Sequence, residues 1–281
     1  MKVHLAVSTY RGHPRESLGA IRVAEECLRK SGVEVLPPDY YGSAMLADAR
    51  NKILAKRPPD ADVTVFIDDD MYPEPMALVK LIEHTKDHPV VSAACTTRTR
   101  PIKLCIKYFN REAQEFLEMD DIPRGRPFLE DVAVGTAFLA LRKDVIEQLT
   151  EQYLSAADWM EEKRREHDRL HVRAEYREKE RSRIEGLRRH SWERYRKLRI
   201  FRFGEIDNEI DLGEDVMLCY RLMQLNIKVL VDPTIVVGHI GDYPYSLADY
   251  LSSQDLKDIE EARKAYAGAT EQANSSLIYV P

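Results

Sequence analysis

The fold is decided by one stretch, Val63-Thr64-Val65-Phe66-Ile67-Asp68-Asp69-Asp70-Met71. Its first half completes an expected strand, Asp62–Ile67, and a short continuous apolar run of this kind is typical of a strand buried on both faces of a parallel sheet. Three carboxylates follow directly, at the carboxyl end of that strand. Because open α/β sheets bind ligands at this edge, the stretch predicts both a core strand and a candidate site.

Strand-like and helix-like segments alternate on both sides of this stretch. Upstream and directly downstream, we expect strands at Lys2–Ser8, Val33–Leu36 and Val90–Ala94, and helices at Glu16–Ser31, Ser43–Lys56 and Pro75–His84. Further along, we expect a hairpin of Leu104–Tyr108 and Ala113–Glu118, strands at Ala133–Leu141, Lys228–Val231 and Ile235–Val237, and helices at Lys143–Leu149 and Gly213–Leu225. Such alternation predicts an α/β fold with a mostly parallel sheet and helices on both faces.

Composition narrows the class of protein. The 281 residues are 44% hydrophobic and 32% charged, and we expect one catalytic domain over residues 1–281. No apolar run approaches 18 residues, which argues against a membrane span. The first residues, MKVHLAVSTY, enter a strand at once and lack the features of a signal peptide, so we expect a cytoplasmic protein. The four cysteines form no CxxC pair, which favours buried thiols over a zinc site.

Charge is distributed unevenly around a formal net charge of −6. Ser155–Phe203 contains 16 Lys or Arg and 10 Asp or Glu, whereas the rest of the chain contains 26 and 38. Its residues are good helix formers with few apolar positions, so we expect a basic, solvated helical insertion over 154–203. Interleaved aromatic residues leave nucleic-acid binding open as an alternative to a purely solvated face. We expect a helical tail over 246–281.

The three carboxylates suggest a metal site. Adjacent anionic groups repel one another unless a cation lies among them, and hard divalent ions bind carboxylate oxygens while leaving positions free for phosphate. Asp68 and Asp70 are two residues apart, so on an extended strand end they point to the same side. An acidic turn after a strand is the alternative interpretation.

Two later motifs add candidate groups. Glu214 and Asp215 follow Gly213 at the start of an expected helix, where the helix dipole also favours acidic residues for purely structural reasons. His239 lies between Gly238 and Gly241, just past an expected strand. The glycines allow the backbone to approach a ligand, and neutral imidazole is a common metal ligand, although a loop histidine can also be merely solvated.

Taken in order, the Asp68–Asp70 strand, the Gly135-Thr136-Ala137-Phe138 strand, the Glu214-Asp215 helix and the His239 strand resemble the GT-A glycosyltransferases, most closely the family 2-type group. The resemblance runs from Val3 to about Gly241, outside the basic segment. It implies a Rossmann-like, mixed sheet. It also implies that Asp68 and Asp70 of an Asp-x-Asp (DxD) motif hold Mn²⁺ or Mg²⁺, with His239 as a further ligand.

The resemblance also implies roles around a nucleotide-sugar donor, a UDP- or GDP-sugar. Asp215 maps onto the catalytic base of inverting members, with Glu214 as its competitor. Further residues implied to contact the donor or the transferred sugar are Thr9, Tyr10, Arg11, Arg50, Asp68, Asp69, Gly135 and Thr136. The polar loop after the fourth strand, with Thr97, Arg98 and Arg100, lies at the same expected edge. The Gln-x-x-Arg-Trp motif of membrane-embedded synthases is absent, which disfavours a processive polysaccharide synthase.

The sequence therefore predicts a metal-dependent, inverting hexosyltransferase acting on an acceptor hydroxyl. The acceptor stays open among a glycan, a protein, a small molecule and modified DNA. One alternative is a glycosyltransferase of the phage type, which would use the basic insertion to bind modified bases in DNA. Another is a nucleotidyltransferase, which usually needs a glycine-rich basic loop near the N-terminus, whereas Ser8–His13 has one glycine.

Overall fold

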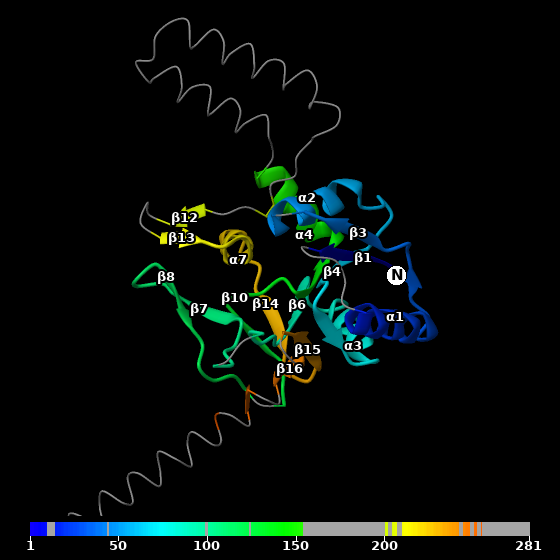
Figure 1. Ribbon diagram of the computed structural model, residues 1–281. Helices are drawn as coiled ribbons and strands as arrows, with labels where there is room; N and C mark the ends of the chain where they lie inside the picture. The colour runs from blue at the N-terminus through cyan, green and yellow to red at the C-terminus, as the bar shows by residue number, and fades with distance from the viewer. Residues whose placement is uncertain are drawn as a thin grey trace, which may run out of the picture.

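The computed structural model describes residues 1–9, 15–43, 45–98, 101–123, 125–153, 200–201, 204–206, 210–241, 244–247, 250–251 and 254. Within them, eight strands form one mixed sheet in the order β2-β1-β4-β11-β6-β14-β9, with β3 also paired to β1 (Figure 1). These strands are β1 (Lys2–Thr9), β2 (Glu34–Val35), β3 (Asp39–Gly42), β4 (Val63–Asp68), β6 (Val90–Ala93), β9 (Phe128–Glu130), β11 (Phe138–Arg142) and β14 (Val229–Asp232). The predicted α/β fold class is confirmed.

Both directions of pairing occur in this sheet. Strand β1 runs parallel to β2, β3 and β4, and β14 runs parallel to β6. Strand β11 lies antiparallel between β4 and β6, and the edge strand β9 lies antiparallel to β14. The parallel core places the carboxyl ends of β1 and β4 at one edge, where Ser8 faces Asp68 in the register.

Helices cover both faces of the sheet (Figure 1). Helices α1 (Arg15–Lys30) and α3 (Ala77–His84) share a hydrophobic cluster with Val65 and Ile67 of β4. Helices α2 (Leu46–Lys56), α4 (Lys143–Tyr153) and α7 (Glu214–Gln224) share the other cluster with Phe66. Because side chains alternate along a strand, Asp68 lies on the same side as Phe66, toward α2 and α7.

Three smaller sheets complete the described part of the chain. The predicted hairpin is confirmed as β7 (Ile106–Asn110) and β8 (Glu115–Glu118), joined by β10 (Val132–Val134). A second sheet contains β5 (Met71–Pro73), β15 (Val237–Ile240) and β16 (Pro244–Ser246). The third is the pair β12 (Gly204–Ile206) and β13 (Ile210–Leu212). Strand β5 begins directly after the three aspartates, so the second sheet adjoins the candidate site.

Two predicted strands are wrong. The apolar run Ala133–Leu141 is two strands in different sheets, because the chain leaves β10 at Val134 and enters β11 only at Phe138. The strand predicted at Ile235–Val237 begins instead at Val237 and continues to Ile240, so His239 lies within a strand and not in a loop. In both cases the continuous apolar run indicates that the segment is buried. It does not indicate the residue at which one strand ends or the next begins.

The predicted basic insertion, 154–203, lies outside the described residues except for its end at Ile200 and Phe201, which are buried. Most of the predicted tail, 246–281, also lies outside them. In its described part, Tyr250 is buried and its hydroxyl donates a hydrogen bond to the carbonyl of Asp120. The start of the tail therefore packs against the domain.

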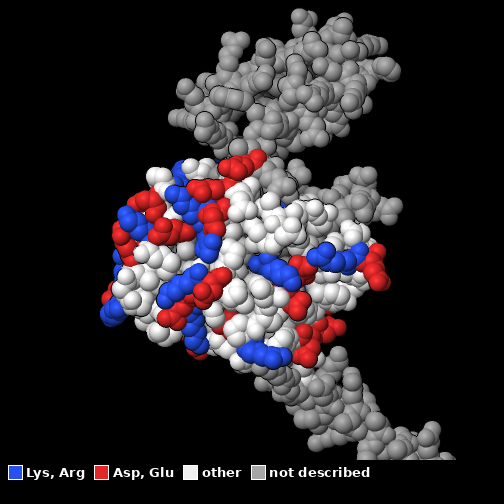
Figure 2. Space-filling model, turned by 180° about the vertical axis from the view of Figure 1, so that it is seen from behind, with Lys and Arg blue, Asp and Glu red and all other residues white. Residues whose placement is uncertain are grey.

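Two surface properties bear on function. Among the described residues, no helix is both long enough and apolar enough to cross a membrane. On the face drawn in Figure 2, Lys and Arg side chains lie among Asp and Glu side chains and not in a separate field. Oppositely charged surface side chains also form close pairs, such as Arg29 with Glu25 at 2.7 Å.

Candidate functional site

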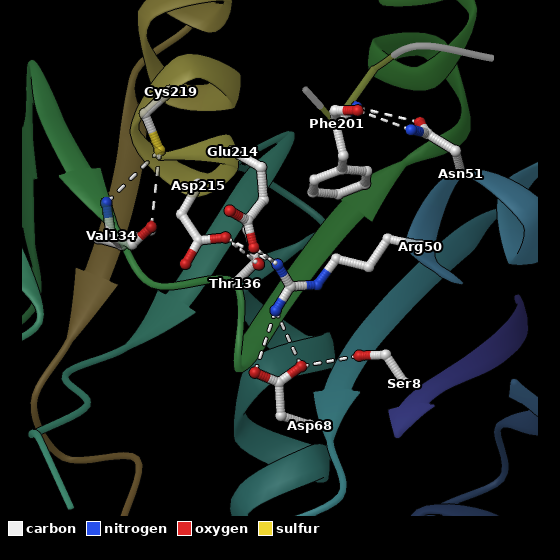
Figure 3. A network of polar contacts seen from close by, with 10 residues as sticks. All are labelled: Ser8, Arg50, Asn51, Asp68, Val134, Thr136, Phe201, Glu214, Asp215 and Cys219. Carbon is white, nitrogen blue, oxygen red and sulfur yellow. Dashed lines mark hydrogen bonds and ion pairs between the residues drawn. The ribbon is translucent and has the colours of Figure 1, made fainter. Parts of the chain in front are cut away.

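A single buried arginine organises the centre of the site (Figure 3). The side chain of Arg50 on α2 is 1% exposed. Its Nη2 donates to both carboxylate oxygens of Asp68, at 2.9 and 3.0 Å. Its Nη1 donates to Asp215 Oδ1 at 2.7 Å and to Glu214 Oε1 at 3.1 Å. One guanidinium therefore joins the end of β4 to the start of α7.

The sequence of α2 explains why Arg50 is buried. It lies three residues after Ala47 and three and four before Ile53 and Leu54, on the helix face that packs against the core. A charge in that position is tolerated only when it is paired. Burial opposes the charge of Arg50, but the carboxylates of Asp68 and Asp215 outweigh burial and raise the pKa of its guanidinium. The arginine stays ionised.

Asp215 combines a fixed oxygen with an open one. Its Oδ1 accepts hydrogen bonds from Arg50 and from Thr136 Oγ1, each at 2.7 Å. Its Oδ2 has no hydrogen-bond partner among the described residues and faces Gly135, where an added Cβ would lie 4.0 Å away. The side chain is 32% exposed. The carboxylate is thus held in place while one oxygen stays accessible.

Glu214, the neighbour of Asp215, is in a different setting. Its side chain is 13% exposed, and its Oε1 accepts only the longer contact from Arg50. Burial and the nearby charge of Asp215 raise the pKa of Glu214. Of the two carboxylates at the start of α7, Asp215 is the more accessible.

The end of β1 fixes the turn that carries the aspartates. Ser8 Oγ donates to Asp68 Oδ1 at 2.7 Å, and the hydroxyl of Thr9 donates to the carboxylate of Asp69. Strand β4 ends at Asp68, and Asp69 and Asp70 form a turn. The prediction that Asp68 and Asp70 share an extended strand end is therefore wrong, because the backbone turns between them.

Asp70 belongs to a second cluster, with His239 and Arg98. Strand β15 pairs antiparallel with β5, and the amide of Ile240 donates to the carbonyl of Asp70 at 2.8 Å. Asp70 Oδ1 lies 3.2 Å from His239 Nε2, and its Oδ2 accepts from Arg98 Nη1 at 2.5 Å. Burial opposes both charges, but the contact with Asp70 outweighs it and raises the pKa of His239, while His239 and Arg98 lower that of Asp70.

This second cluster offers two donor atoms for a divalent ion. Among the residues described, no group of three His, Cys, Asp or Glu side chains is arranged to hold a metal by itself. However, His239 Nδ1 donates to the carbonyl of Thr96 at 2.8 Å, which directs Nε2 toward Asp70 in the manner of an oriented metal ligand. Sites for Mg²⁺ commonly use one or two carboxylates plus water and substrate phosphate, and neutral imidazole is a common ligand of divalent metals, so Asp70 and His239 are candidate ligands for such an ion. Asp68, whose oxygens both accept from Arg50, stays a predicted ligand.

The other predicted site residues fall into three groups. Gly135 and Thr136 lie beside Asp215, in the break between β10 and β11. Both Nη atoms of Arg50 bind carboxylates, so its predicted contact with donor phosphate stays a prediction. Three residues lie outside the described part of the chain, namely Tyr10, Arg11 and Arg100.

Sequence reasoning missed one pair of supporting residues. Asn51 Nδ2 donates to the carbonyl of Phe201 at 2.6 Å, and the amide of Phe201 donates back to Asn51 Oδ1 at 3.0 Å. The Phe201 ring then lies 5.6 Å from the guanidinium carbon of Arg50 and 5.0 Å from the Phe66 ring. The signal available was the Arg50-Asn51 dipeptide, although nothing in its spacing indicates a partner 150 residues away.

Comparisons with known proteins give weak similarities. No protein-family model matches the chain, and no curated protein matches its sequence. Among solved structures it is similar to A197 from STIV, with a TM-score of 0.42 and 12% identity over 86% of each chain. A glycosyltransferase involved in glycosylation of the major capsid of PBCV-1 matches with a TM-score of 0.27 and 16% identity, over 52% of this chain and 61% of that one. A third similar structure is 4-diphosphocytidyl-2C-methyl-D-erythritol synthase from Anaerococcus prevotii, with a TM-score of 0.30 and 12% identity over 54% of this chain and 75% of that one. At these TM-scores, function has to be argued from the site itself.

Proposed function

We propose that this protein transfers a sugar from a nucleotide-diphosphate sugar to an acceptor hydroxyl, with a divalent ion and with inversion at the anomeric carbon. The observation that carries the proposal is the accessible carboxylate of Asp215, held by Arg50 against the end of β4, where Asp70 and His239 offer donors to a metal. A leaving-group site and a base are thus available at one edge of the sheet, as this reaction requires.

The leaving group of the reaction is a diphosphate. Asp70 and His239 would hold Mn²⁺ or Mg²⁺, and a bound divalent ion offsets the negative charge that develops on the departing phosphate oxygens. The hydroxyls of Ser8 and Thr9 keep the aspartate turn in place by hydrogen bonds to Asp68 and Asp69. The protein's part at this end of the site is to fix the position of the donor phosphates.

Asp215 is the proposed general base. Its Oδ2 accepts the proton of the acceptor hydroxyl while the acceptor oxygen attacks the anomeric carbon and the nucleoside diphosphate departs. Hydrogen bonds from Arg50 and Thr136 to Oδ1 prevent the carboxylate from rotating. A positioned base of this kind contributes about 10²–10⁴-fold to the rate.

Binding of nucleotides separates this proposal from the nucleotidyltransferase alternative. UDP, GDP, CTP and ATP would be titrated into the full chain by calorimetry, once with Mn²⁺ and once with EDTA. We expect UDP or GDP to bind tightly only with Mn²⁺. Stronger binding of a nucleoside triphosphate than of either diphosphate would contradict the proposal and favour nucleotidyl transfer.

The acceptor follows from a different measurement. Mass spectrometry of products from candidate glycans, peptides, small molecules and duplex DNA with modified bases would identify it. The DNA alternative rests on the basic insertion, which lies outside the described residues. It predicts duplex binding that weakens steeply with salt, because each phosphate contact releases a counterion.

A further inference from the structure

We infer that Arg98 is a positioning residue that changes partner during the reaction cycle: it neutralises Asp70 in the empty site and binds the donor diphosphate once a divalent ion is present. This inference rests on the proposed function and adds to it a residue that selects for the loaded, metal-bound site. Four features of the described residues support it.

The first feature is the mismatch in exposure between the two partners. Asp70 is 14% exposed, whereas the Arg98 side chain that covers its Oδ2 is 59% exposed. The guanidinium therefore reaches a sheltered carboxylate from solvent, over an ion pair of 2.5 Å. Little packing opposes its departure, because an exposed arginine loses few van der Waals contacts when it rotates.

The second feature is the contrast with Arg50. Arg50 is 1% exposed and binds three carboxylates through Nη1 and Nη2. Moving it toward a phosphate would leave three carboxylates without their cation, two of them largely buried, at a high cost in free energy. Arg98 holds one carboxylate and can exchange it for a phosphate at little cost. Of these two arginines, Arg98 is therefore the one suited to leave its carboxylate and bind the donor diphosphate.

The third feature is the fixed backbone beneath Arg98. A Cβ added to Gly241 would lie 2.3 Å from the carbonyl oxygen of Arg98, so β15 leads into a chain that passes directly against it. On the other side, the amide of Thr97 donates to the carbonyl of Lys103 at 2.8 Å. Because its main chain packs against Gly241 and follows the hydrogen-bonded Thr97, rotation of the side chain is the simplest way for the Arg98 guanidinium to move.

The fourth feature is the balance of charge at this edge. Among the described residues, the carboxylates of Asp68, Asp70, Glu214 and Asp215 contact the guanidinium groups of Arg50 and Arg98 and the imidazole of His239. A divalent ion on Asp70 supplies the neutralisation that Arg98 gives in its absence, and it repels the guanidinium. A diphosphate then adds negative charge beside the ion, and the planar fork of arginine suits phosphate oxygens.

The test measures two affinities, which should change in opposite directions when the Arg98 side chain is removed. Mn²⁺ binding without nucleotide would be followed by electron paramagnetic resonance, and UDP and GDP binding at saturating Mn²⁺ by calorimetry. In Arg98→Ala we expect Mn²⁺ to bind about threefold or more tightly, because its competitor for Asp70 is gone. We expect the nucleotide to bind about tenfold or more weakly, since a charge-assisted phosphate contact is lost.

Two further variants sharpen the result. Arg98→Lys keeps the charge and loses the planar fork. Its Mn²⁺ affinity should therefore be close to that of the wild-type chain, and its nucleotide affinity should lie between those of the wild-type chain and Arg98→Ala. Arg142→Ala is the matched control, because loss of Arg142 removes the same charge. Arg142 is the last residue of β11, at the end of the strand away from Thr136, and pairs with Asp144. The substitution should leave both affinities unchanged.

The outcomes separate the inference from the proposed function. A wild-type chain that binds neither UDP nor GDP at saturating Mn²⁺ contradicts the proposed function, and it is measured before any variant. If the wild-type chain binds a nucleotide, weaker Mn²⁺ binding in Arg98→Ala overturns the inference, because Arg98 then merely supports Asp70. Unchanged nucleotide affinity in that variant overturns it as well, since no phosphate contact was lost.

Discussion

Asp215 and Glu214 are neighbours whose carboxylates differ in their accessibility to a ligand. Both begin α7 and both contact Arg50, but Asp215 is 32% exposed and Glu214 is 13% exposed. Only for Asp215 does a glycine, Gly135, leave space beside a carboxylate oxygen. The structure thus supplies a physical reason for preferring the second residue of the pair, which the sequence supported only through its resemblance to a family.

Substitution of these two residues tests that preference. Asp215→Asn keeps the size of the side chain and removes its basicity, so kcat should fall at least about 100-fold while donor affinity changes little. Glu214→Gln, the matched variant, keeps an acceptor for Arg50 and should lower kcat less than about tenfold. Steady-state kinetics and donor titrations measure both quantities. The assignment is wrong if the Glu214 variant loses the larger part of kcat.

Arg50 has a structural role that can be measured without any substrate. Arg50→Met keeps the length of the side chain but leaves Asp68, Glu214 and Asp215 without their shared cation. The free energy of unfolding should fall by about 3–5 kcal/mol, as for other buried charges that lose their partner. Urea denaturation measures it, and Arg142→Ala, which removes a more exposed pair, should cost less than about 1 kcal/mol. Similar losses in the two variants would refute a central role for Arg50.

At the scale of elements, the second sheet is what brings His239 to Asp70. Strand β5 follows the aspartate turn without a break, and β15 pairs with it so that His239 lies opposite Met71. The sequence predicts the aspartates, the histidine and their glycine neighbours. It does not predict this pairing, because β5 is three residues long and its apolar pattern contains no information about its partner.

The close passage at Gly241 gives a test at this scale. Gly241→Ala places a methyl group 2.3 Å from the carbonyl oxygen of Arg98, so one of the two segments must shift. We expect a loss of about 1–3 kcal/mol in the free energy of unfolding, together with weaker Mn²⁺ binding. Gly19→Ala is the control, since nothing lies within 4 Å of a Cβ there and the site is in helix α1, where alanine should stabilise by about 0.4–1 kcal/mol. Equal Mn²⁺ affinities in wild type and Gly241→Ala would argue against the coupling of β15 to the site.

Strand β1 carries a pH-sensitive group that is not part of the Asp70–His239 cluster. His4 is fully buried, its Nε2 lies 3.1 Å from Asp39 Oδ2, and burial lowers its pKa below the ordinary value of 6.5 although Asp39 acts in the opposite direction. The unfolded chain therefore takes up this proton first, and stability is lost as the pH falls below 6.5 toward the folded pKa.

Urea denaturation at pH 7.5 and pH 5.5 measures this contribution. His4 should lower the stability of the wild-type chain over that interval by at most about 1.4 kcal/mol per pH unit below 6.5, whereas His239, whose pKa is raised, acts in the opposite direction in both chains. His4→Gln removes the titrating group and should lose correspondingly less. An unchanged pH dependence in His4→Gln would disprove the assignment.

At the scale of the whole molecule, alternating strands and helices are predictable from the sequence, and their connections are less so. The strands β1, β4 and β6 stand out because each is a continuous apolar run buried on both faces, and the helices between them stand out because each buries one apolar face. The break at Gly135, Thr136 and Ala137, where the chain passes from one sheet to another, does not stand out. The burial of Arg50 is equally hidden, since its three partners come from β4 and α7 and meet only in the folded chain.

The central claim is that donor cleavage needs both the divalent ion and the carboxylate at position 215. Phosphorus nuclear magnetic resonance of the full chain, incubated with Mn²⁺, a panel of nucleotide sugars and its acceptor or water, measures the products directly. At least one UDP- or GDP-sugar should yield the nucleoside diphosphate, EDTA should abolish this release, and Asp215→Asn should slow transfer at least about 100-fold. Release of pyrophosphate from a nucleoside triphosphate, with no nucleoside diphosphate formed from any nucleotide sugar, would contradict the claim.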